Sequence, residues 1–172
     1  MHNGFAHQER SVLIISCFIS LWSDLYMVWL NSVDYKNQEY KELRLNSPLY
    51  ENIRLDFNPL KISDVSGHEP SWKDWHCYRN PLRVYSPDFD ILVSYFNKVY
   101  PIIDASDNTE RDSFDVCFDN WIKQDEWIKI VHNIEVDLKN FSKVEQKFLK
   151  SFIAWIKEAL QHTSVIVVEG NL

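Results

Sequence analysis

The feature that most constrains the fold is an amphipathic segment at residues 142–161, which leads almost directly into a β-branched run at residues 165–168. Apolar side chains recur in the first segment with the period of a helix. Ser142, followed three residues later by Glu145, has the pattern of a capping box at its start. Residues 165–168 are apolar at every position, which predicts a strand covered on both faces. A helix followed closely by a buried strand favours an α+β fold.

Weaker signals predict the other elements. The order Ser86, Pro87, Asp88 indicates a helix start, and the alternation of polar and apolar residues at 50–57 favours a strand. Two apolar arcs between residues 113 and 141 lie on different faces of a helical wheel. We therefore expect either a break or kink near residues 124–125 or a helix that is covered by partners on two sides. We therefore predict an α+β, helix-rich single domain, in which helices at about 86–100, 113–123, 125–141 and 142–161 pack on a small sheet that includes strands near 50–57 and 164–169.

Residues 1–30 form an apolar N-terminal extension unlike the rest of the chain. Residues 12–30 are nearly continuously apolar and are just long enough to cross a bilayer, although Asp24 near one end is costly there. Three interpretations stay open: a non-native or disordered extension, a packed helix, and a membrane anchor, which is the least favoured. Met27 is an alternative start, because removal of residues 1–26 would leave one globular domain at residues 31–172.

Composition argues against several function classes. The chain has only three glycines, far apart, so it contains neither a phosphate-binding loop nor a dinucleotide fingerprint. The chain has a net charge of −7, whereas a nucleic-acid-binding protein needs a basic surface, so the charge argues against that class. Three widely spaced cysteines favour reduced thiols in a cytoplasmic protein over a zinc site or a disulfide framework. We therefore expect no cofactor, no metal and no nucleic-acid partner.

The net charge is concentrated between residues 104 and 126, where eight carboxylates face only Arg111 and Lys123. On the wheel of the predicted helix, four of these acids lie within about 60° of one another: Asp112, Asp115, Asp119 and Glu126. This cluster is either an ordinary solvated face or a surface complementary to a basic protein. Surfaces of the second kind speed association and select partners more than they add affinity.

Residues 68–78 combine aromatic side chains with potential metal ligands and nucleophiles. In this segment, the spacing of the histidines, the cysteine and the carboxylates matches no known zinc-binding pattern. Trp72, Trp75 and Tyr78 either plug a core or act as hot spots in a partner site. One alternative function is a membrane-tethered module anchored by residues 12–30. The other is an enzyme that combines carboxylates of the acidic stretch with His68 or His76. It requires a deep pocket with carboxylates of raised pKa.

In general type, the chain resembles the immunity proteins that bacteria pair with secreted polymorphic toxins. The likeness extends over residues 31–172, a small, acidic, tryptophan-rich domain without an active-site motif. It rests on the four clustered acids, on residues 117–122 and on the closing residues 167–172. The resemblance implies a cytoplasmic protein that blocks a toxin domain, with an acidic surface in the basic groove of the toxin and aromatic anchors beside it. The residues expected to bind the partner are Asp112, Asp115, Asp119, Glu126, Trp72, Trp75 and Tyr78.

Overall fold

The structure, a computed structural model, describes residues 28–30, 38–62 and 71–171. The predicted α+β class is confirmed. In chain order the elements are β1 (Lys41–Leu43), β2 (Arg54–Pro59), α2 (Trp72–Trp75), β3 (Leu82–Tyr85), α3 (Ser86–Asn97), β4 (Ile102–Ile103), β5 (Glu110–Arg111), β6 (Asn120–Lys123), α4 (Gln124–Asp137), the 3-10 turn η2 (Leu138–Asn140), α5 (Lys143–Ala159) and β7 (Val165–Gly170).

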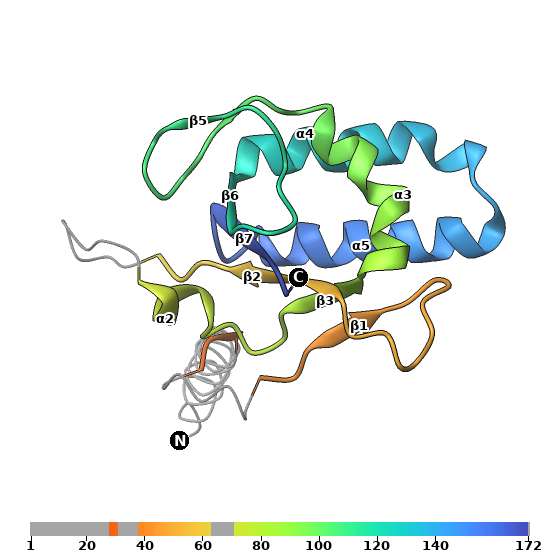
Figure 1. The fold of residues 1–172 in the computed structure, drawn as a ribbon, viewed down its shortest axis with the longest axis horizontal. Coiled ribbons are helices and arrows are strands. Elements are labelled where there is room, and N and C mark those ends of the chain that lie inside the picture. Colours follow the sequence, from red (N-terminus) through yellow and green to blue (C-terminus); the bar gives the residue numbers. More distant parts are fainter. Residues whose placement is uncertain (1–27, 31–37, 63–70, 172) are drawn as a thin grey trace, which may run out of the picture.

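Five strands form a mixed sheet in the order β1-β3-β2-β7-β6, and β4 pairs with β5 in a separate small hairpin. β1 runs parallel to β3, whereas the other neighbours in the main sheet are antiparallel. The long helices α3, α4 and α5 lie on one side of the sheet, and the short α2 lies on the other (Figure 1). The β4–β5 hairpin stands beyond the β6 edge of the sheet.

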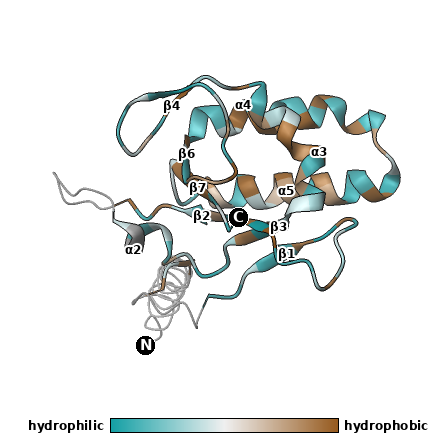
Figure 2. Cartoon of the chain, in the orientation of Figure 1, coloured by the Kyte–Doolittle hydropathy of each residue, from teal (hydrophilic) through white to brown (hydrophobic). Residues whose placement is uncertain are grey.

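The main core lies between the three long helices and the sheet, where their apolar residues meet (Figure 2). On β2, Leu55 and Phe57 belong to this core, because alternate strand residues point to the same face. The ring of Phe57 is fully buried, with centroids 5.5 Å from the ring of Phe152 and 6.1 Å from that of Trp127. Burial of several aromatic rings around one strand residue therefore holds the helical layer on the sheet.

The last strand is covered on both faces, as its sequence predicts. Ile166 and Val168 belong to the main core under the helices. Val165 and Val167 belong to a second, smaller apolar cluster on the other side of the sheet, together with Leu60 and Trp121. Because β7 lies between β2 and β6, neither of its edges is left for solvent.

The capping box of the last helix is also confirmed. Ser142 Oγ accepts a hydrogen bond from Glu145 N at 3.3 Å, and Ser142 N donates to Glu145 Oε2 at 2.8 Å. The helix that follows extends over Lys143–Ala159, close to the predicted range of 142–161. The predicted start at Ser86 is correct as well, because α3 begins there.

Two predicted elements need correction. The helix expected at 113–123 is wrong: residues 113–119 form a looped turn, and Asn120–Lys123 is strand β6. The strand expected near 50–57 begins only at Arg54. The expected break near residues 124–125 is present, as the boundary between β6 and α4. The helical wheel that placed the four acids on one face therefore does not apply to Asp112, Asp115 and Asp119.

Residues 12–27 of the apolar stretch lie outside the described residues, and residues 28–30 lie inside them. Among the described segments, none of the helices is both long and apolar enough to span a membrane.

Candidate partner-binding site

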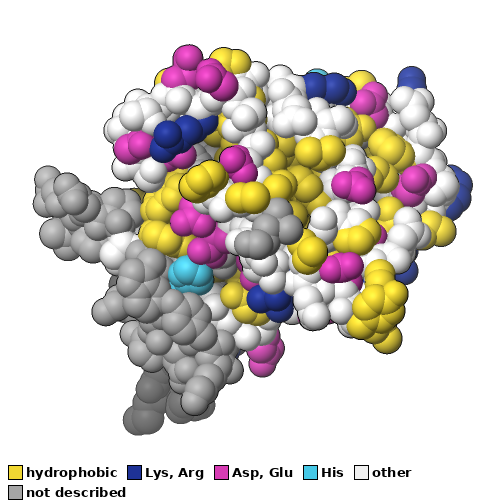
Figure 3. Space-filling model, in the orientation of Figure 1, with side chains coloured by type: hydrophobic (Ala, Val, Ile, Leu, Met, Phe, Trp, Pro, Cys, Tyr) yellow, Lys and Arg dark blue, Asp and Glu magenta, His cyan; other side chains and the backbone are white. Residues whose placement is uncertain are grey.

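A pocket of about 690 Å³ opens between the β4–β5 hairpin and the loop at residues 112–119. We call it the acidic pocket, because the described residues that line it include five carboxylates and a single guanidinium: Asp104, Glu110, Asp112, Asp115 and Asp119, with Arg111. Aromatic surface is present as well, since Phe118 and Trp121 also line the pocket and Phe118 is 69% exposed. Acidic side chains are visible over this part of the molecule, at the upper left of Figure 3.

Arg111 on the hairpin is the only base among the described residues that line the pocket, and its charge is already shared. Arg111 Nη2 lies 2.8 Å from Asp107 Oδ2, and Arg111 Nε lies 3.5 Å from Asp104 Oδ2. Asp104 is buried and also accepts a hydrogen bond from Ser106 N. By contrast, Glu110 and Asp112 are exposed and form no ion pair with another described residue. The pocket therefore has a net negative charge that nothing among the described residues neutralises.

Asn120 organises the opposite wall of the pocket. Its buried side chain accepts a hydrogen bond from Asp115 N at 3.1 Å and donates to Asp115 O and Phe118 O at 2.6 and 2.8 Å. Tyr100 Oη donates to the same amide oxygen at 3.2 Å. Asp115 Oδ1 in turn accepts from Cys117 N at 2.8 Å. A single amide side chain thus replaces the backbone bonds that a helix would have made and holds the acidic loop in a turn.

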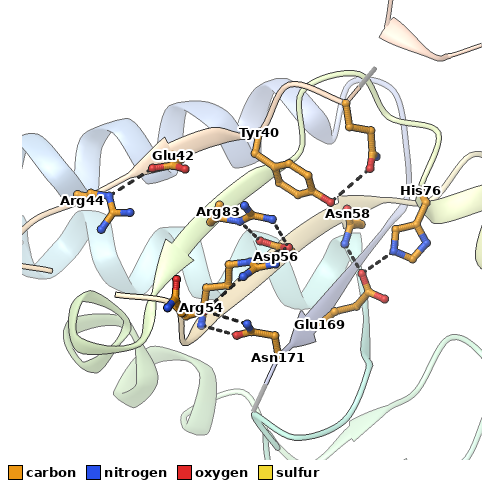
Figure 4. A network of polar contacts seen from close by, with 12 residues as sticks. Tyr40, Glu42, Arg44, Arg54, Asp56, Asn58, His76, Arg83, Glu169 and Asn171 are labelled. Atoms are coloured by element: carbon orange, nitrogen blue, oxygen red, sulfur yellow. Dashed lines mark hydrogen bonds and ion pairs between the residues drawn. The ribbon is translucent and has the colours of Figure 1, made fainter. Parts of the chain in front are cut away.

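Asp119 connects the acidic pocket to a polar cluster on the outer face of the sheet. At the centre of this cluster, the Glu169 carboxylate accepts a hydrogen bond from Trp75 Nε1 at 3.1 Å and lies 2.9 Å from His76 Nε2. Asn58 on β2 also points its amide at Glu169 (Figure 4). Burial raises the pKa of Asp119, and the nearby Glu169 carboxylate raises it further, whereas His76 has the opposite effect. Of these three groups only Asp119 lines the pocket, and the Glu169 carboxylate and His76 influence it from the adjoining cluster.

Three of the predicted acids come together in the pocket, and one does not. Asp112, Asp115 and Asp119 line it, although on a loop rather than on a helix. Glu126 lies on α4 and pairs with Lys129 at 2.9 Å, so it is not part of this site. The helical-wheel prediction also did not include Asp104 and Glu110, which line the pocket. Only the overall charge of residues 104–126 gave a signal for those two acids.

The structure places the three predicted aromatic anchors in different environments. Tyr78 is 5% exposed and packs against Trp155 and Trp29, so it fills the core, which is the other of its two predicted roles. Trp75 is half-buried and lies edge-on to Trp121, which lines the pocket, at 4.6 Å between ring centroids. The side chain of Trp72 lies outside the part of the chain that the structure describes.

The other candidate chemistry in residues 68–77 is only partly described. His68 and Glu69 lie outside the described residues, whereas His76 and Asp74 lie inside them. Within the described ranges, no group of three or more His, Cys, Asp and Glu side chains is arranged to hold a metal ion.

No family model, curated protein or solved structure matches this chain. Its function is therefore inferred from the site alone.

Proposed function

We propose that this chain is a binding protein of the immunity type, which blocks a toxin domain in the cytoplasm by occupying a basic surface of that domain. One observation supports this function above all: a concave site that, among the residues the structure describes, is lined by five carboxylates and by one base that is already paired. Such a site attracts lysine and arginine side chains of a protein and repels nucleic acid.

The proposal accounts for the rigid construction of the pocket. Asn120 fixes one wall, and Ala105 N, bonded to Trp121 O at 3.1 Å, ties the hairpin to β6. Preorganised carboxylates lose little conformational entropy when a partner binds. The exposed ring of Phe118 adds apolar area next to the charges, as expected for an anchor that becomes buried in an interface.

The proposed partner is the protein encoded next to this chain, and the test is its association rate. We would compare the wild-type chain with a variant that carries Asp112→Lys, Asp115→Asn and Asp119→Lys. Asparagine at position 115 keeps the oxygen that accepts from Cys117 N. The variant should associate at least about tenfold more slowly at low salt and lose most of the salt dependence of the rate.

A matched control reverses three exposed carboxylates outside the pocket, namely Glu39, Asp90 and Glu158. This control changes the net charge by about as much as the pocket variant, but it leaves the pocket intact. An association rate that responds to the total charge alone, with equal losses in both variants, would contradict the proposal. So would a neighbouring protein that does not bind the wild-type chain.

An enzyme is the second candidate, because one observation favours it. The pKa of Asp119 is raised at the edge of a pocket, next to the His76–Glu169 pair, and a carboxylate of raised pKa is suited to general acid catalysis. The binding function is preferred because the described residues that line the pocket include neither a histidine nor a cysteine. If the second candidate were correct, Asp119→Asn would abolish turnover of a substrate without weakening the binding of the neighbouring protein.

A further inference from the structure

A second charged groove lies on the solvent-facing side of α5, and its charge is opposite to that of the acidic pocket. Its volume is about 450 Å³. We call it the lysine groove, because the described residues that line it include three lysines and no carboxylate: Lys143, Gln146, Lys147, Lys150, Ser151 and Ala154. A groove with three positive charges is unexpected on a chain whose net charge is −7.

The helical repeat places these three lysines on one stripe of α5. Lys143, Lys147 and Lys150 are four and three residues apart, so their side chains lie within about 60° of one another around the helix. All three are exposed, and none forms an ion pair with another described residue. By contrast, Lys157 on the same helix pairs with Glu135 on α4 at 2.6 Å. The mutual repulsion of the three ammonium groups is therefore not offset by an ion pair among the described residues.

The floor of the lysine groove is made of small side chains. Ala154 lies one turn beyond Lys150 and is exposed, and Ser151 also lines the groove. These short side chains leave room between the longer lysine side chains, whose methylene stems can cover apolar surface while their ammonium groups stay in water. The groove is therefore suited to a large apolar side chain that has negative charges next to it.

The acidic pocket presents this combination. The ring of Phe118 is 69% exposed and lines the pocket together with the five carboxylates. Such a ring would fill the space above Ala154, and a lysine ammonium group could approach its face. Glu110 and Asp112, which are exposed and unpaired among the described residues, would then meet the lysines. The two sites are complementary both in charge and in the size of their apolar parts.

Within one molecule the two sites lie apart. α4 begins at β6, beside the acidic pocket, and α5 with its lysine groove begins at the opposite end of α4 (Figure 1). The 14 residues of α4 span about 21 Å. The two sites therefore meet only between different copies of the chain. A contact between two different surfaces is heterologous, so it joins copies head to tail in a ring or a filament.

We propose that the lysine groove of one copy binds the acidic pocket of a second copy, with Phe118 of the second copy packed over Ala154 of the first. The proposal goes beyond the proposed function: it uses the same pocket, but it does not depend on a toxin partner. A basic partner and the lysine groove would compete for the same carboxylates, so binding of such a partner would release the second copy.

Sedimentation velocity of the full chain alone tests this contact with three variants. The groove variant removes the positive charges and keeps much of each stem: Lys143→Gln, Lys147→Gln and Lys150→Gln. The pocket variant removes two carboxylates and the ring: Asp112→Asn, Phe118→Ala and Asp119→Asn. A matched control changes three exposed lysines outside both sites: Lys61→Gln, Lys98→Gln and Lys129→Gln. All three variants should fold, because every altered residue is exposed.

The wild type and the control should self-associate with a Kd below about 100 µM at low salt, and about 0.5 M salt should weaken this association at least tenfold. The groove variant and the pocket variant, each alone, should associate at least about tenfold more weakly than the wild type. An equimolar mixture of these two variants should form a dimer with one copy of each, because the groove variant keeps its acidic pocket and the pocket variant keeps its lysine groove. Both variants have a net negative charge, so attraction between total charges cannot produce this dimer.

The proposal is overturned by a wild-type Kd above about 100 µM, or by a groove or pocket variant that self-associates as strongly as the wild type. It is also overturned by a mixture that does not dimerise, or by a control that is impaired as much as the groove variant. These measurements contain no other protein, so their failure leaves the proposed function untouched. A neighbouring protein that does not bind the chain would, in turn, leave the self-association intact.

Discussion

Gly170 at the end of β7 lies against Val116 in the acidic loop so closely that a Cβ atom at position 170 would stand 1.8 Å from the Val116 carbonyl oxygen. The obstructing atom is backbone, so it cannot swing aside as a flexible side chain would. Gly170→Ala should therefore displace the loop and lower the free energy of unfolding by roughly 1–3 kcal/mol. It should also slow the association of a basic partner without any change in net charge. Urea unfolding and association kinetics would measure the two effects.

Ser164→Ala is the matched control for this substitution, because Ser164 is exposed just before the other end of β7. Its effect on stability should stay within about 0.5 kcal/mol. If Gly170→Ala proved equally harmless, the close contact between β7 and the acidic loop would be refuted.

The C-terminal helix and strand could be predicted from the sequence because their signals are local. Ser142 and Glu145 specify the helix start within one turn, and four consecutive β-branched residues favour a strand wherever they lie. The acidic loop could not be predicted in this way. Phe118 and Trp121 have the spacing of one helical face, but the side chain of Asn120 bonds the backbone of its neighbours and holds a turn instead.

The negative charge of the acidic pocket could be predicted from the sequence, but the set of acids that line it could not. The excess of acids between residues 104 and 126 located the correct segment of the chain. Which acids meet depends on the pairing of β4 with β5 and on the attachment of that hairpin to β6, both of which are contacts between distant residues. Asp104 and Glu110 therefore join the pocket, whereas Glu126 turns to Lys129 on its own helix.

Replacement of Asp119 by Asn should separate stability from function. The folded-state pKa of Asp119 lies above its ordinary value of 3.8, first because of burial and then because of the Glu169 carboxylate. The folded protein thus holds this proton more tightly than the unfolded chain does. The resulting stabilisation is present below the ordinary pKa and is lost as pH rises through the folded-state pKa. At neutral pH the ionised side chain therefore opposes folding.

Asp119→Asn removes that opposition, so Tm at pH 7 should rise, but by no more than about 2 °C because water screens the partly exposed group. Binding of a basic partner should weaken in the same variant. Near about pH 3, where the wild-type carboxyl is protonated as well, the two proteins should melt together. A lower Tm for the variant at pH 7 would show that the charge of Asp119 stabilises the fold.

Two buried tryptophans allow a comparison of hydrogen bonding at nearly constant shape. Trp127 is fully buried, and its Nε1 has no hydrogen-bond acceptor among the described residues. Trp155 is 3% exposed, and its Nε1 donates to Asn80 O at 3.1 Å. Both substitutions to Phe remove a similar volume, but only Trp155→Phe breaks a bond. Trp155→Phe should therefore destabilise the protein by about 1 kcal/mol more than Trp127→Phe, measured by urea unfolding. Equal losses would indicate that the indole N–H of Trp127 is satisfied as well.

The capping box of α5 should contribute to stability in a way that depends on pH. Ser142→Ala removes the oxygen that accepts from Glu145 N and should cost about 1 kcal/mol, whereas Ser142→Gly should cost only a few tenths. Hydrogen bonds from the Ser142 side chain and backbone lower the pKa of Glu145 below its ordinary value of 4.5. The stabilisation from ionised Glu145 is therefore present above that value and is lost as pH falls through the folded-state pKa. Thermal melts from about pH 7 to pH 3 should show the gap between wild type and Ser142→Ala narrowing on acidification, because protonated Glu145 accepts more weakly. A gap that stays constant over this range would mean that Ser142 caps the helix without help from Glu145.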